Sequence, residues 1–138
     1  MACFLVSAAE AIVVAGVSKV VEKNEKKPAE LNVTLGDNEI QKVHVTPFST
    51  KLKWLSRLQL GGSALLAFEH VWHGEIVPYF PFLTAMGDPS EATVMFDEMA
   101  TVGVGMAIVT TLAWAGMVAV STAVEKKAMK ESAALAKK

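Results

Sequence analysis

The chain has 138 residues, of which 52% are hydrophobic, and its formal net charge is −1. This length fits one domain, and the near-neutral charge argues against a nucleic-acid partner, which would require a basic surface. The single cysteine, Cys3, excludes an intramolecular disulfide and a CxxC site.

Basic residues are confined to two parts of the chain. All 13 Lys and Arg residues fall within 19–57 and 126–138. Basic residues concentrate on the cytoplasmic side of membrane proteins, so this distribution predicts an integral protein of a bacterial-type plasma membrane. The predicted fold class is an all-α integral membrane protein with three transmembrane helices, the N-terminus outside and the C-terminus cytoplasmic.

The first predicted span covers about residues 3–22. Residues 1–18 carry one charge, Glu10, and the basic residues follow the apolar run. That order is typical of a retained anchor and differs from a cleavable signal peptide. The apolar run 1–18, at a helical rise of ~1.5 Å per residue, barely covers the hydrocarbon core of a bilayer. A tilted or interfacial helix is therefore the alternative.

A cytoplasmic loop is predicted over residues 23–53. Within it, LNVTLGDNEIQKVHV (residues 31–45) places alternating apolar and polar residues around the turn-forming segment Gly36-Asp37-Asn38. Alternation on both sides of a turn predicts a small β-hairpin in this first loop.

The second predicted span covers about residues 56–78. It follows an amphipathic segment whose side chains suit the headgroup level of a bilayer. These side chains are Lys51, Lys53, Trp54 and Arg57. The span is apolar until FEHVWHGE, residues 68–75, which holds four titratable side chains.

An outer loop is predicted over residues 79–96. Its aromatic residues fit a belt at the membrane surface. Near its end, Asp88 or Ser90 can cap the start of the next helix, and Pro89 suits the first turn.

The third predicted span covers about residues 97–124, and the tail 125–138 is predicted to be cytoplasmic. Residues 99–124 carry no charge, and ~20 apolar residues suffice to cross a bilayer as a helix. Small residues recur at every fourth position: Gly103, Ala107, Thr111, Ala115 and Ala119. Such a stripe lets helices approach closely, and it predicts packing within the chain, a homo-oligomer, or docking to a larger membrane complex.

Titratable side chains form the main candidate site. Glu69 and His73 are four residues apart and His70 and His73 three apart, so each pair is close on a helix. The predicted depths bring Glu10 to the same half of the membrane, together with a secondary polar cluster. That cluster comprises Glu75, Asp97 and Glu98.

Ionisable groups inside a membrane are a functional hypothesis by default. The candidate metal ligands are Glu69, His70, His73 and Glu10, and a set of carboxylates and imidazoles suits Zn, Mn or Fe. Protonated carboxylates, histidine–carboxylate pairs, a haem contact and a purely structural polar network are the alternatives. The spacing matches neither His-Glu-x-x-His nor the Glu-x-x-His of di-iron bundles.

Two functions follow from these observations. The first is a small oligomeric membrane protein that binds a cation, either a proton or a transition metal, in transport. The alternative is a non-catalytic membrane anchor or assembly subunit in which the Glu/His cluster is structural. The sequence contains no nucleophile–base pair or recognised catalytic motif that would support an enzyme.

Overall fold

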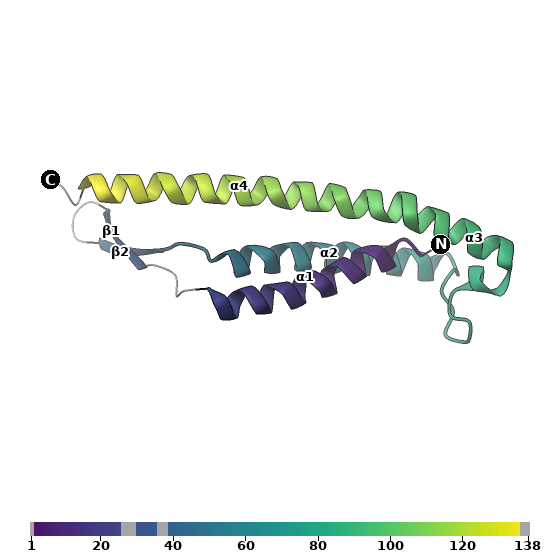
Figure 1. Ribbon diagram of the computed structural model, residues 1–138. Coiled ribbons are helices and arrows are strands. Elements are labelled where there is room, and N and C mark those ends of the chain that lie inside the picture. Colours follow the sequence, from purple (N-terminus) through teal and green to yellow (C-terminus); the bar gives the residue numbers. More distant parts are fainter. Residues whose placement is uncertain (1, 26–29, 36–38, 136–138) are drawn as a thin grey trace.

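The computed structural model describes residues 2–25, 30–35 and 39–135. The elements are α1 (Phe4–Asn24), β1 (Glu30–Leu35), β2 (Glu39–His44), α2 (Phe48–Trp72), η1 (Thr84–Gly87), α3 (Pro89–Glu98), η2 (Met99–Gly103) and α4 (Val104–Leu135). The long helices α1, α2 and α4 run along one another (Figure 1). The strands and the C-terminal end of α4 lie at one end, and the N-terminus and α3 lie at the other.

A close antiparallel contact joins α1 and α2 (Figure 1). On α2, the side chains that face the neighbouring helices include a set that recurs every seven residues: Ser49, Ser56, Ser63 and His70. The Ser56 hydroxyl donates to the carbonyl of Ala11, and the Ser63 hydroxyl donates to that of Phe4, both at 2.9 Å. Small hydroxyl residues let the two backbones approach and hydrogen-bond across the contact.

Helix α4 is attached to α2 by polar contacts near the end that holds the strands. The Trp114 indole donates to the Lys51 carbonyl at 2.6 Å. The Lys51 ammonium donates to Thr122 Oγ1 and Glu125 Oε2, each at 3.0 Å. The Lys51 side chain is therefore buried between the helices, and its position at headgroup depth stays a prediction.

The prediction of three transmembrane helices is wrong. In the described part of the chain, two helices are long and apolar enough to cross a membrane, Phe4–Asn24 and the continuous helix Pro89–Glu131. The predicted span 56–78 is not among them, because α2 carries charged or polar side chains along its length. It also ends at Trp72, and Gly74 then adopts a positive φ of 72°, as is common just after a helix.

The two strands are short and pair antiparallel, with Leu31 opposite Val43. They lie beside the C-terminal part of α4, outside the helix pair α1–α2 (Figure 1). The predicted turn Gly36-Asp37-Asn38 lies outside the described residues.

The predicted start of the last long helix is confirmed. Asp88 caps α3 by accepting the Ser90 amide at 2.8 Å, and Pro89 occupies the first turn. From there one helical run continues through Met99–Gly103 into α4. The π-helical form of Met99–Gly103 was not predicted from the sequence.

The capping carboxylate makes this helix start sensitive to pH. Hydrogen bonds from the Ser90 hydroxyl and amide lower the pKa of Asp88 below its ordinary value of 3.8. Because the pKa of Asp88 is lower in the folded than in the unfolded protein, the cap stabilises the fold fully at a pH above the unfolded-state pKa. This stabilisation is lost as the pH falls through the folded-state pKa. We expect the Ser90 amide resonance in detergent micelles to titrate below pH 3.8. An equal titration in Asp88→Asn would contradict this assignment.

Candidate functional site

A polar cluster with one residue from each long helix joins the three helices. It is formed by Glu10, Gln59 and Thr111. The Gln59 amide donates to Glu10 Oε2 at 2.6 Å and to the Ala107 carbonyl at 3.3 Å. Thr111 donates to Glu10 Oε1 at 2.7 Å. Gln59 is 1% exposed, so its donors are used entirely within the protein. We call this set the three-helix cluster.

Glu10, a predicted ligand together with Glu69, His70 and His73, lies apart from these residues in the structure. Gln59, the hydrogen-bond partner of Glu10, lies ten residues before Glu69 on α2. At the helical rise of ~1.5 Å per residue, the two sites are about 15 Å apart along the helix. Glu10 is therefore not a ligand of a common site with Glu69, His70 and His73.

The remaining predicted residues surround an open groove at the other end of α2, near the N-terminus. The groove has a volume of about 400 Å³. Its polar lining is Cys3, Glu69, His70, His73, Glu75 and Glu98. Asp97 does not line it; its side chain is exposed, and its carbonyl accepts the Thr101 hydroxyl.

Within this groove the side chains do not converge as metal ligands do. Glu69 and His73 are exposed, and His73 Nδ1 lies 2.9 Å from the Glu69 carbonyl oxygen. His70 is buried, and its Nε2 lies 3.9 Å from Glu75 Oε2. Among the residues that the structure describes, no three Cys, His, Asp or Glu side chains are placed to hold a metal ion. Binding of Zn, Mn, Fe or haem there stays a prediction.

Cys3 is a neighbour of His70 that sequence reasoning missed. Its sulfur lies 3.5 Å from His70 Nε2, and the ring of Phe4 meets the imidazole edge to face at 5.5 Å. Cys3 and His70 are 67 positions apart in the sequence, so no local spacing predicts their contact. Gln59 was also missed, although it is three residues beyond a member of the seven-residue repeat of α2.

Only the first half of the predicted small-residue stripe packs within the chain. Gly103 and Ala107 are buried and Thr111 is partly buried, whereas Ala115 and Ala119 are exposed. A Cβ atom on Gly103 would stand 2.9 Å from Val6 Cγ2 and 3.2 Å from the Cys3 carbonyl oxygen. Gly103 therefore lets α1 approach the beginning of the α4 run. A homo-oligomer formed through the exposed half stays a prediction.

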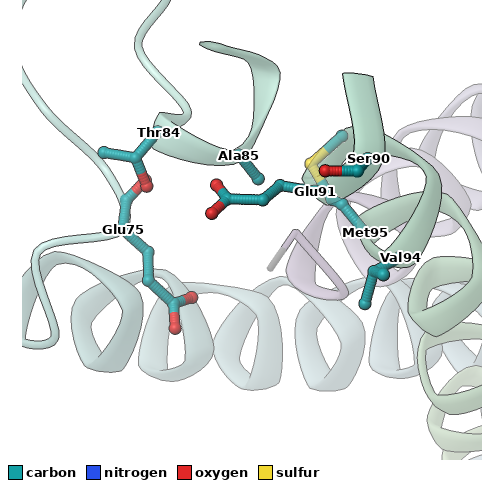
Figure 2. A pocket seen from close by; sticks show the side chains of 7 residues that line it. All are labelled: Glu75, Thr84, Ala85, Ser90, Glu91, Val94 and Met95. Atoms are coloured by element: carbon teal, nitrogen blue, oxygen red, sulfur yellow. The ribbon is translucent and has the colours of Figure 1, made fainter. Parts of the chain in front are cut away.

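A second pocket, also of about 400 Å³, lies between the loop after α2 and helix α3 (Figure 2). The side chain of Glu91 extends toward Thr84, and the carboxylate of Glu75 is turned away from it. Two carboxylates that diverge in this way do not form an acid–base pair.

The outer surface of the helices is largely apolar. Large exposed hydrophobic side chains occur on every long helix, with Ile12 and Val13 on α1, Leu65 and Phe68 on α2, and Val109 and Leu112 on α4 as examples. Few large hydrophobic side chains are buried in the described residues, and the largest fully buried side chains there, Gln59 and Ser18, are polar. Comparison with protein families, with characterised proteins and with solved structures finds no match for this chain.

Proposed function

We propose that the protein is a non-catalytic, membrane-embedded assembly subunit. The observation that carries this proposal is the exposure of its most apolar helices. In the most apolar stretch of α1, only 17% of the residues are buried. In the most apolar stretch of Pro89–Glu131, only 11% are buried. A soluble protein encloses such helices in its core, so lipid or other membrane helices are the surroundings that fit this surface.

The polar contacts between the helices support a structural role for the ionisable groups that make them. Glu10 is bonded to Gln59 and Thr111, and Lys51 is bonded to Thr122 and Glu125. Hydrogen bonds of this kind hold helices together in lipid, where the hydrophobic effect does not. This pattern favours the assembly subunit over a transporter, which would require a polar pathway.

The distribution of charge supports one orientation. Helices α1 and α4 run in the same direction, so their C-terminal parts lie at the same end of the molecule (Figure 1). These parts hold the basic residues Lys19 and Lys23 of α1 and Lys126, Lys127 and Lys130 of α4. Exposed aromatic side chains, Tyr79, Phe80 and Phe82, occur in the loop at the opposite end. By the positive-inside tendency, the basic end is cytoplasmic and the N-terminus is outside. In this orientation α2, which is not apolar enough to be a span by itself, returns between the two ends packed against α1 and α4.

Alkaline extraction and cysteine labelling test both parts of this proposal. We expect the protein to stay in membranes at high pH. In a Cys3→Ser background, Gly87→Cys should react with a membrane-impermeant maleimide in intact cells, and Ala133→Cys only after permeabilisation. Both positions are exposed, so burial does not limit either reaction. Release into the aqueous fraction would contradict the membrane proposal, and the opposite labelling pattern would contradict the orientation.

A further inference from the structure

The carboxylate of Glu10 has acceptor capacity left after its contacts within the chain. Each of its two oxygens receives one hydrogen bond, from Thr111 and from Gln59. A carboxylate oxygen can accept more than one hydrogen bond. Glu10 is only partly buried, and it lines a groove on the outer surface between α1 and α4.

The depth of Glu10 makes this carboxylate unusual. Thr111, which it contacts, lies near the middle of the charge-free residues 99–124. Glu10 itself lies near the middle of the apolar residues 1–18. An acidic side chain at the centre of a membrane pairs with a partner of opposite charge or faces a polar cavity.

The chain itself has no basic residue to offer at this depth. Residues 1–18 and 58–125 contain no Lys or Arg. The ammonium of Lys51, which is buried within the bundle, is bonded to Thr122 and Glu125. Among the described residues, Glu10 has no ion pair. A second copy related by two-fold symmetry would set one acidic groove against another.

The shape of the groove suits a helix. It has a volume of about 450 Å³. Its lining on α4 includes Val104, Ile108 and Leu112, which are four residues apart and exposed, and Val6 of α1 lines it as well. Residues at this spacing form a ridge of the kind that packs against the grooves of another helix. Apolar walls of this composition offer a hydrated ion little beyond the carboxylate and the Thr111 hydroxyl.

We propose that this groove receives a transmembrane helix of a different protein that carries a lysine or arginine at mid-membrane depth. The basic side chain pairs with Glu10, and the apolar flanks of that helix pack on the ridge Val104–Ile108–Leu112. Charge complementarity selects the occupant, because the groove presents an acidic group that has no counter-charge among the described residues. This inference rests on the proposed function, whose assembly partner it specifies by chemistry.

The test uses two synthetic helices in phosphatidylcholine vesicles, a polyleucine peptide with one central lysine and an all-leucine control. Energy transfer reports binding to full-length protein labelled at Ala133→Cys in a Cys3→Ser background. We expect the lysine peptide to bind about tenfold more tightly than the control, as a desolvated charge pair implies. Glu10→Gln should remove that difference, and Glu69→Gln, an exposed acid outside the groove, should preserve it.

A second variant guards against misfolding of Glu10→Gln. Ile108→Trp fills the groove without altering the three-helix cluster, and it should also abolish preference for the lysine peptide. Equal binding of both peptides to wild-type protein would overturn the inference and leave a surface covered by lipid. Self-association that Ile108→Trp abolishes would overturn it in favour of a second copy. Because alkaline extraction is measured separately, either result contradicts the partner without contradicting membrane embedding.

Discussion

Replacement of Gly103 by leucine is expected to lower the free energy of unfolding by about 3 kcal/mol, at the upper end for an overpacked contact. The first added carbon would stand 2.9 Å from Val6 Cγ2 and 3.2 Å from the Cys3 carbonyl oxygen. Valine in a helix is held in one rotamer, and a backbone carbonyl cannot rotate aside, so the helices must separate. That separation would also pull Cys3 away from His70.

Thermal unfolding in mild detergent, followed by circular dichroism, measures this effect. Gly116→Leu is the matched control, because it lies on the same helix and a Cβ there meets nothing within 4 Å. The control should be unchanged or slightly stabilised, since leucine favours helix over glycine by roughly 1 kcal/mol. Equal destabilisation of the two variants would show that the effect comes from the helix itself and not from the contact with α1.

Replacement of Lys51 by methionine is expected to cost about 3–5 kcal/mol, the range for removing one partner of a buried ion pair. The side chains of Lys51 and Glu125 are 6% and 14% exposed, and their charged atoms are 3.0 Å apart. Methionine keeps most of the lysine volume, so the loss comes from the carboxylate that is left without its partner. The contact also joins α2 to α4, and its loss should loosen the end that holds the strands.

The neighbouring pair Lys53–Glu22 supplies the control. Its charged atoms are 2.9 Å apart, but its side chains are 39% and 55% exposed. Lys53→Met should therefore change stability by about 0–1 kcal/mol, as is usual for surface pairs. Chemical denaturation of both variants, and of the double variant Lys51→Met/Glu125→Leu, completes the comparison. A double variant that is no more stable than Lys51→Met alone would contradict a burial penalty on Glu125.

The apolar helices and the capped start of α3 could be predicted from the sequence. Charge-free runs and the segment Asp88-Pro89-Ser90 act locally, so one sequence window contains all the information. The number of spans could not be obtained in this way. The span 56–78 was predicted from its apolar centre, whereas the charged and polar residues along α2 leave it below the apolar content of α1 and of Pro89–Glu131.

The candidate site was misjudged because it depends on how α2 is rotated. Successive residues point about 100° apart around a helix, so the inward position of His70 turns Glu69 outward. The serine repeat of α2 fixes that rotation, and the repeat is visible in the sequence. By itself, the repeat predicts that Gln59 lies inside and Glu69 outside.

The predicted small-residue stripe turns away from the packing face of α4 for a related reason. Steps of four residues advance about 40° beyond a full turn, so Ala115 lies roughly 120° away from Gly103 around α4. The side chains that contact the other helices instead switch to a step of three, from Thr111 to Trp114. The sequence holds both patterns, and only the neighbouring helices decide which one packs.

The order of the helices in the chain has a consequence for biosynthesis. A ribosome completes α1 and α2 well before it reaches Thr122 and Glu125. During that interval the Lys51 ammonium has no carboxylate partner on α4, and Gln59 lacks the Ala107 carbonyl. The nascent α1–α2 pair therefore carries a polar face that α4 later covers. We expect the three-helix unit to become stable in the membrane once translation has passed Glu125.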